Sequence, residues 1–370
     1  MINDPVPRSA ARQPRAIVLI NGQPAGGLLE FQVDANSTSQ ADTMSVRLST
    51  HQMGADWWSR VQAADMDVFV GFPRDSTRYS TDDLTRIVSG RLDDIQLDML
   101  SNEVQIVGRD LTAALIDTKA VLQFTNKSSS YIAESFAREH GLTPKVTQTQ
   151  RPTGAYYRDL RVSLINAKSQ WDVLAFLAER EGFEVFVRGR ELHFRPKEEI
   201  EKAEPFVIAW HPPKGERSHP ISNAMTVNFR RNLTLARTIR VVGIVASSKS
   251  RFEVYAQRER VFNQVISPKL RLQAPPQQYV YSLPAMPRDE AQKWVNSKLL
   301  ELSRHEMILT AVLPGDMRLT SRTPILVTGT GTAFDQVYLP NSLVHSYSVE
   351  DGYTMRVDCR NHPPESQAVI

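Results

Sequence analysis

The chain has 370 residues, 41 % of them hydrophobic, and its 44 Lys and Arg residues nearly balance 41 Asp and Glu residues, for a formal net charge of +3. The basic residues are scattered and form no stripe, which argues against sequence-specific nucleic-acid binding, so we expect any contact with DNA to be loose passage. A single cysteine, Cys359, excludes a disulfide within the chain and argues against a cysteine-based zinc site.

The length and the two ends set further limits. At about 150 residues per domain, the chain has room for two or three domains. No stretch approaches the ~20 uninterrupted apolar residues that span a bilayer, and the start, MINDPVPRSAARQPR, lacks the apolar segment of a signal peptide. We expect a flexible arm over residues 1–12 and a flexible tail over residues 364–370, because both are polar and contain little to bury.

Residues 13–117 have the pattern of short strands. The segment RAIVLING ends in an Asn-Gly turn signal, and LLEFQVDANS and TMSVRLST then alternate apolar and polar residues. MDVFVGF is a short apolar run, DWWSR fits a single helical turn, and RIVSGRLDDIQLDMLSNEVQIVGRD is typical of a strand, a short break, a strand and a return strand. Such strands, about ten residues apart, predict a closed or nearly closed antiparallel β unit.

The period becomes helical in residues 118–200. Ser128 to Ser130 offer N-caps for a helix in YIAESFAREHG, and Ser169 with Asp172 resembles a capping box at the start of a second helix, SQWDVLAFLAEREGF, which stops at Gly182. FEVFVRG and ELHFRP then predict a hairpin. We expect a small α+β domain here.

Strands return after the charged segment KEEIEKAEP and a proline-rich loop. AMTVNFRR and TIRVVGIVAS predict a hairpin, and four further strand segments follow residue 305, separated by Pro-Gly, Gly-Thr-Gly and Asp-Gly turns. Between them lies a less regular stretch and a third helix that Pro287 starts. We therefore expect a second β domain in residues 201–250 and 305–363, interrupted by an insertion with a helix at 251–304. The two β-rich stretches share a rhythm but show no clean repeat by residue identity.

The sequence carries no strong catalytic signature. It has no Walker A loop, no GxSxG elbow and no HExxH motif, and its eight histidines show no ligand spacing. Gly329-Thr-Gly331 is explained better by a hairpin turn than by a dinucleotide-binding loop. Any two carboxylates that meet in space can form a glycosidase pair, but four neighbouring ones fit structural roles better, Asp110 as a helix N-cap: Asp93, Asp94, Asp110 and Asp117. We expect no catalytic residue, no cofactor and no metal.

Four arginines are grouped on the predicted hairpin of the second β domain: Arg230, Arg231, Arg237 and Arg240. They fit a channel lining that meets phosphates by charge alone. They fit equally well a solvated strand face, or a subunit contact in which they pair with carboxylates.

Three phrases carry a resemblance to a known family: VGRDLTAALID (107–117), SYIAESFAREHGL (130–142) and SQWDVLAFLAEREGFEVFVRGRELHFRP (169–196). Their order and spacing resemble the phage late control protein D family. That family includes the baseplate hub of Mu-like contractile-tailed phages and is similar to the hub part of type VI secretion VgrG spike proteins. The resemblance extends over nearly the whole chain, although none of the three phrases is a catalytic signature.

The resemblance implies a fold and a mechanical task. Members form homotrimers in which each subunit contributes two tube-type β-barrel domains, here expected at 13–117 and at 201–250 with 305–363. Three copies make a pseudo-sixfold ring that joins a sixfold tail tube or tube-initiator hexamer to a trimeric spike, contacts other baseplate proteins, and leaves a channel for DNA. The expected location is the tail baseplate of the virion, assembled in the host cytoplasm without membrane insertion.

The alternatives remain open at this point. No oligonucleotide-binding-type or β-helix segment follows the last strand, so we expect the spike to be a separate polypeptide. The same architecture serves in phage-tail-like bacteriocins and secretion spikes, and the sequence does not separate these. Two alternatives come from other classes of protein: a tail-associated peptidoglycan hydrolase and a carbohydrate-binding β module. A carbohydrate-binding module would need exposed aromatic clusters, but the aromatic pair Trp57-Trp58 is explained better by core packing.

Overall fold

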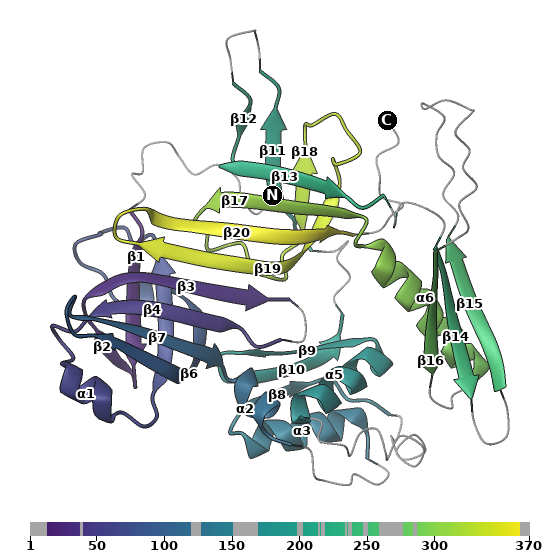
Figure 1. The fold of residues 1–370 in the computed structure, drawn as a ribbon, viewed down its shortest axis with the longest axis horizontal. Coiled ribbons are helices and arrows are strands. Elements are labelled where there is room, and N and C mark those ends of the chain that lie inside the picture. Colours follow the sequence, from purple (N-terminus) through teal and green to yellow (C-terminus); the bar gives the residue numbers. More distant parts are fainter. Residues whose placement is uncertain are drawn as a thin grey trace.

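The molecule is built mainly from β-strands with a few short helices, which confirms the predicted α+β, mainly β fold class (Figure 1). The computed structural model describes residues 13–37, 40–119, 127–150, 169–197, 203–213, 215, 219–233, 235, 239–246, 251–258, 277–283 and 287–362. The expected arm at 1–12 and tail at 364–370 lie outside these residues. The strands form one 14-stranded sheet and two three-stranded sheets.

The first β unit contains seven strands and one short helix, α1 (Ala55–Arg60), which confirms the single helical turn expected at DWWSR. Apolar residues alternate along the strands and bury one face, as Val33 and Val46 show with no exposed surface. The strands are β1 (Arg15–Ile20), β2 (Gln23–Ala25), β3 (Leu28–Asn36), β4 (Thr43–Ser49), β5 (Asp65–Gly71), β6 (Thr85–Asp98) and β7 (Glu103–Asp110).

One strand in this unit is longer than the sequence indicated. Residues 85–98 form the single strand β6, with a β-bulge between Leu92 and Asp94 where a break between two strands was expected. A bulge lets a strand bend without losing its partners, so β6 pairs with β5 along its first half and with β7 from residue 90 onward. A 3-10 turn (Thr81–Asp83) precedes it.

The second β unit also contains seven strands. They are β11 (Phe206–His211), β12 (Ile221–Ser222), β13 (Thr226–Arg231), β17 (Met307–Pro314), β18 (Ile325–Thr328), β19 (Val337–Ser348) and β20 (Gly352–Asn361). The Gly-Thr-Gly segment connects β18 to β19, which pair antiparallel, so it is the predicted hairpin turn. Cys359 is fully buried on one side of β20, as the alternation indicated.

The strand pairing of the second unit repeats that of the first. Taken in chain order, the seven strands pair in the same way, as first–second, first–fifth, third–fourth, fourth–seventh, fifth–sixth and sixth–seventh. The sixth strands β6 and β19 are both long and both carry a bulge. The units differ in that β11 runs parallel to β18, whereas β1 runs antiparallel to β5. The internal repeat that residue identity hides is therefore visible in the topology.

A small α+β part follows β7 and lies beside the first unit in Figure 1. It contains α2 (Thr112–Asp117), α3 (Ser129–Glu139), β8 (Thr143–Val146), α5 (Gln170–Glu181), β9 (Phe183–Arg188) and β10 (Glu191–Pro196). The capping box of Ser169 and Asp172 and the left-handed Gly182 begin and end α5, as predicted. This part has its own core, built around side chains such as Phe136 and Leu174.

The insertion between β13 and β17 has a sheet of its own. It comprises β14 (Ile239–Ala246), β15 (Arg251–Arg258), β16 (Gln277–Leu283) and α6 (Arg288–Ser303), which Pro287 precedes as predicted. Strand β14 pairs with β15 and β16, so the expected hairpin with β13 does not form, and residues 251–283 contain strands where little regular structure was expected. The pairing thus groups β14 with the insertion, as Figure 1 shows.

Candidate assembly interface

The two β units are joined edge to edge by pairing of β3 with β19. The pairing is antiparallel and runs from Asn36 opposite Ser342 to Glu30 opposite Ser348. It continues at both ends, because Ser37 N donates to Asn341 O at 2.9 Å and Val349 N donates to Leu29 O at 3.1 Å. One hydrophobic core extends across both units, so the seam of β3 and β19 is the middle of a single packed body.

The core side of this seam is closely packed. Phe31 on β3 and Tyr347 on β19 stack with their ring centroids 5.5 Å apart. Next to them, His345 is buried and makes a 2.6 Å hydrogen bond through Nδ1 to the Tyr353 hydroxyl. Burial lowers the pKa of His345 to about 4, because the surroundings penalise a charged ring. The neutral imidazole therefore serves packing and one hydrogen bond.

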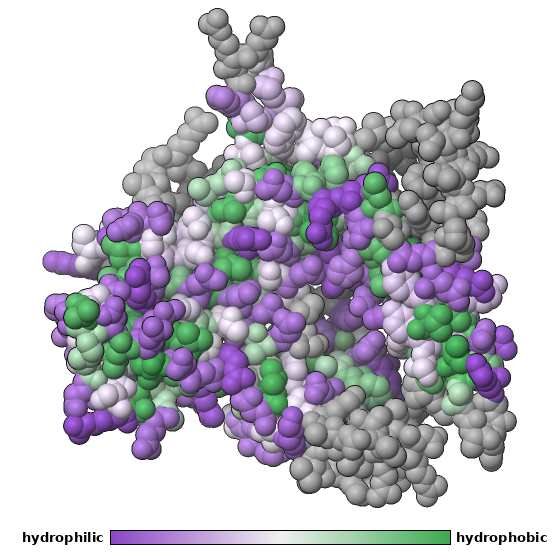
Figure 2. All heavy atoms as spheres, in the orientation of Figure 1, coloured by the Kyte–Doolittle hydropathy of each residue, from purple (hydrophilic) through white to green (hydrophobic). Residues whose placement is uncertain are grey.

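The seam makes one continuous array of eight strands, in the order β13, β17, β20, β19, β3, β4, β7 and β6. Each unit supplies four of them, and Figure 1 shows the eight lying side by side. The face turned away from the core is turned toward the viewer in Figures 1 and 2. There hydrophilic and hydrophobic residues are interspersed.

The charged groups on this outer face are largely paired with each other. Arg47 on β4 lies 3.0 Å from Glu30 on β3 and 3.3 Å from Glu103 on β7. Arg356 on β20 lies 3.2 Å from Asp358 on the same strand. A face of this kind presents both signs of charge in close alternation, so it offers little net attraction to a polyanion.

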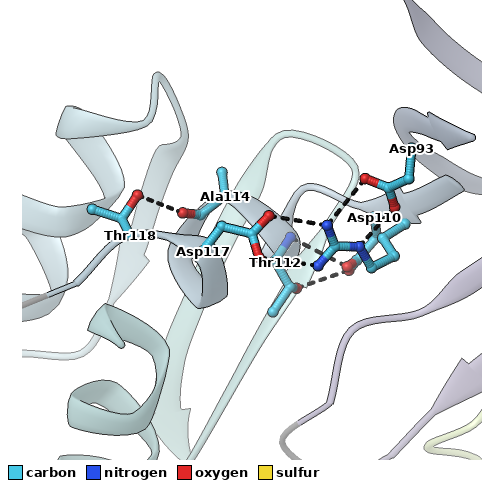
Figure 3. A network of polar contacts seen from close by, with 7 residues as sticks. Asp93, Asp110, Thr112, Ala114, Asp117 and Thr118 are labelled. Carbon is cyan, nitrogen blue, oxygen red and sulfur yellow. Dashed lines mark hydrogen bonds and ion pairs between the residues drawn. The ribbon is translucent and has the colours of Figure 1, made fainter. Parts of the chain in front are cut away.

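A second ion-pair network ties β6 and β7 to the α+β part. Arg109 donates to Asp93 at 2.7 and 3.0 Å and to Asp117 at 2.9 and 3.2 Å (Figure 3). Hydrogen bonds to Asp93 and then Asp117 raise the pKa of Arg109. Asp110 accepts from the Thr112 N–H and hydroxyl just before α2, as in an Asx turn. The N-cap position itself is held by Leu111, so the expected N-cap role of Asp110 is wrong by one residue. Asp93, Asp110 and Asp117 are therefore held in local networks, and Asp94 is exposed at the bulge.

The eight-strand array ends in two edges that have no partner strand among the described residues. At one end β13 pairs with β17 alone. At the other end, the segment of β6 from Asp94 to Asp98 pairs with β7 alone, because β5 accompanies β6 only up to Arg91. Unpaired strand edges present rows of N–H and C=O groups that readily accept another strand. The array is thus open at both ends.

The four predicted arginines do not form one cluster. Arg230 and Arg231 lie on β13, whereas Arg240 lies on β14 in the insertion, where it stacks over Tyr255 at 4.5 Å. Arg231 forms a 3.2 Å ion pair with the buried Glu306, and Arg230 is exposed on the outer face. Arg237 lies outside the described residues. The predicted grouping on a hairpin is therefore wrong for Arg240, while Arg230 remains a candidate for a channel or subunit contact.

A buried polar junction joins the β units to the α+β part. Asp42 and Asp110 line a small cavity there together with Arg322. Burial, with the charge of Asp42 beside it, raises the pKa of Asp110 to about 7, and burial raises the pKa of Asp42 to about 6. Arg322 lies 3.5 Å from Glu184 and stacks over Phe186 at 3.7 Å. No sequence motif marks this junction, because its members come from four distant segments.

Within the described ranges, no group of three or more His, Cys, Asp or Glu side chains is arranged to hold a metal ion. None of the helices described by the structure is both long and apolar enough to span a bilayer.

Solved structures of tail proteins share this fold at low sequence identity. The tail protein from Neisseria meningitidis MC58 matches with a TM-score of 0.69 and 13 % identity, over 94 % of this chain and 97 % of that chain. The 43 kDa tail protein of prophage MuSo2 from Shewanella oneidensis matches with a TM-score of 0.64 and 12 % identity, over 94 % and 98 %. The Escherichia coli c3393 protein, a component of the type VI secretion system with structural similarity to the T4 tail proteins gp27 and gp5, matches with a TM-score of 0.52 and 10 % identity, over 95 % and 78 %.

These matches agree with the resemblance carried by the three phrases in the sequence, and at such identities they establish the fold. No protein-family model and no curated protein sequence matches the chain.

Proposed function

We propose that this chain, which has the fold of phage tail proteins, is a structural baseplate hub of a contractile phage tail. Three copies form a pseudo-sixfold ring that joins the sixfold tail tube to a trimeric spike and leaves a channel for DNA. The observation that supports this best is the repeated seven-strand unit within one chain. Two equivalent units per chain are what a threefold assembly needs in order to match a sixfold partner.

In the proposed ring, the eight-strand array forms the wall of the channel. Its outer face carries paired charges such as Arg47 with Glu30 and Glu103, so much of the basic surface that a passing polyanion meets is already compensated. Hydrophilic residues on this face also keep water in the bore. In this reading the hub acts mechanically, carries no catalytic residue, and works in the virion baseplate after assembly in the host cytoplasm.

The partners follow from the two symmetries. The sixfold side of the ring receives the tail tube or a tube-initiator hexamer, and the threefold side receives the trimeric spike, with other baseplate proteins around the rim. The likeness to the E. coli type VI secretion component supports a second setting for the same hub, a secretion spike or phage-tail-like bacteriocin. Capsid genes next to the gene for this chain would favour a phage. Sheath and tube genes without capsid genes would favour a bacteriocin.

Electron microscopy of the purified full chain tests the proposal. Particles with threefold symmetry, a central hole and a mass of three chains are the expected result. A strictly monomeric mass at micromolar and higher concentrations, with and without a co-expressed spike, would overturn it. A turbidity assay on purified cell walls separates the hub from a peptidoglycan hydrolase, because the hub leaves the turbidity unchanged.

A further inference from the structure

The geometry points to a defined strand pairing between chains: the end of β6 in one copy pairs antiparallel with β13 of the next, with Asp98 opposite Asn228. This inference rests on the trimer proposed above and specifies the contact that closes it. The template is the β3–β19 seam, which the same molecule already contains. If the two β units are equivalent neighbours in a ring, the contact between chains must repeat the contact within the chain.

The pairing patterns fix which strands correspond. The third strands of the two units are β3 and β13, and the sixth strands are β6 and β19. Within a chain, the third strand of the first unit pairs with the sixth strand of the second. Between chains, the third strand of the second unit, β13, must therefore meet the sixth strand of the first unit, β6. These are the two open edges of the array.

The bulges fix the register of the sixth strands. In β19 the residue opposite Asp358 is Ser342, directly after the bulge, and in β6 the residue opposite Val107 is Asp94, also directly after the bulge. Counting from there, Ser346 in β19 corresponds to Asp98 in β6.

The third strands are aligned through their partners. Gln32 lies opposite Ser45 in the first unit, and Asn228 lies opposite Thr310 in the second. Ser45 and Thr310 correspond because they face Val107 and Asp358. Gln32 therefore corresponds to Asn228.

The seam then gives the contact between chains residue by residue. Gln32 faces Ser346 within the chain, so Asn228 faces Asp98 of the next copy. Along the same antiparallel ladder, Phe229 then faces Leu97 and Arg230 faces Gln96. The alternation is also preserved, because Phe229 and Leu97 correspond to Val33 and His345, which face the core at the seam.

Exposure at the two open edges supports this pairing. At the seam, Phe31 is 2 % exposed and Val33 is fully buried. Their counterparts on β13, Val227 and Phe229, are only half-buried. A neighbouring strand laid along β13 would cover both, as β19 covers the two residues of β3.

The β6 side shows the same contrast more strongly. Tyr347 is half-buried at the seam, whereas its counterpart Met99, in the turn directly after β6, is 68 % exposed, and the adjacent Leu100 is 96 % exposed. In the inferred register Met99 lies against Val227. A partner strand at this edge would cover both apolar side chains.

The charges of the two edges are complementary. Asp94, Gln96 and Asp98 are exposed along β6 on the outer face, and Arg230 is exposed on the same face of β13. In the inferred register Arg230 lies opposite Gln96, so the two carboxylates are its diagonal neighbours on either side. Opposite charges at such cross-strand positions stabilise a pairing, and a shift by one residue would turn Arg230 to the other face.

Cysteine cross-linking of the full chain tests the register. The seam hydrogen bonds at Val349 and Ser37 place Gln32 and Ser346 at a non-hydrogen-bonded pair, where side chains approach most closely. Asp98→Cys in one tagged chain and Asn228→Cys in another should therefore form a disulfide between chains on mild oxidation. The double variant D98C/N228C should form covalent trimers on a non-reducing gel.

Two matched controls accompany this experiment. Gln32→Cys with Ser346→Cys should form the equivalent disulfide within one chain, without any ladder of linked chains. Asp98→Cys with Arg230→Cys is displaced by two residues and should link much less. The native Cys359 is buried and adds no background.

The outcomes separate the register from the trimer. A trimeric mass with efficient linking of the matched pair supports the inference. A trimeric mass with linking of the displaced pair, or of neither pair, overturns the register and leaves the trimer proposal intact. A monomeric mass at every concentration, with no link, overturns both.

A charge reversal gives an independent measurement. Arg230→Glu should weaken trimer formation by about tenfold or more per contact, because it sets like charges beside each other. Adding Asp94→Arg and Asp98→Arg should restore it. Retained association in R230E, with an unchanged melting temperature, would count against this contact.

Discussion

Phe31 and Tyr347, which are far apart in the sequence, stack across the seam of β3 and β19 with their ring planes inclined by 15°. Each belongs to a different β unit, and the strands that carry them pair directly, residue opposite residue. The contact therefore makes the two units one body with a shared core. The stability of that body should depend on it.

Phe31→Ala is expected to lower the free energy of unfolding by about 3–5 kcal/mol, because it removes a buried ring and leaves a cavity. Urea unfolding followed by fluorescence measures the change. Gln32→Ala, on the exposed face of the same strand, should stay within about 0.5 kcal/mol of the parent chain. Equal effects of the two variants would show that the seam is not packed as described.

The buried junction predicts a pH dependence. The pKa of Asp110 is about 7 in the folded chain, above its ordinary value of 3.8, so the folded state keeps a proton that the unfolded state loses. The stability that protonated Asp110 contributes is therefore fully present below pH ~4. It declines as the pH rises toward 7, by up to about 1.4 kcal/mol per pH unit.

Asp110→Asn should flatten this decline, since the amide carries no charge at any pH. Asn is already present at the equivalent position of the second unit, where buried Asn361 accepts the Met307 N–H at 3.1 Å. Unfolding at several pH values measures the difference between variant and parent. Glu350→Gln in an exposed turn is the control and should leave the slope unchanged. If the pH dependence of the unfolding free energy persists in D110N, it arises from other groups, of which Asp42 is the first candidate.

Gly90 on β6 is expected to tolerate no side chain. A Cβ there would lie 2.0 Å from the Arg109 carbonyl oxygen, which belongs to the backbone of the paired strand β7. Gly90→Ala should therefore destabilise the chain by more than about 2 kcal/mol, because relief requires shifting the strand ladder. A Cβ at Gly54 meets nothing within 4 Å, so Gly54→Ala should change the melting temperature little.

Cys359 should be unreactive in the native protein. The thiol is fully buried on β20, and burial raises its pKa, so almost no thiolate is present near neutral pH. A chromogenic disulfide reagent should give no reaction until a denaturant is added, and then one thiol per chain. Rapid native labelling would indicate that β20 opens readily.

The features that the sequence predicted well are those set by neighbouring residues. The capping box at Ser169 and the stop at Gly182 act within a few residues, so α5 was placed correctly. The alternation around Val33 and Val46 placed β3 and β4 for the same reason. Local patterns also identified the turn at Gly329 and the start of α6 at Pro287.

The features that the sequence did not predict depend on distant partners. Arg240 seemed to share a hairpin with Arg230 because the two segments are adjacent, but β13 pairs with β17 beyond the insertion. The internal repeat appeared in the sequence only as a shared rhythm, because equivalent positions share a face and not a residue type. Phe31 corresponds to Val227, and Asp110 corresponds to Asn361.

The insertion lies where the two units differ most. In the first unit β3 leads directly to β4, whereas in the second β13 and β17 are separated by a whole sheet and α6, which Figure 1 shows at the side of the array. Around a closed ring such an appendage would occur at every other position. The inner wall of such a ring would repeat six times around the axis, whereas its outer rim would repeat only three times, so molecules inside and outside would meet different symmetries.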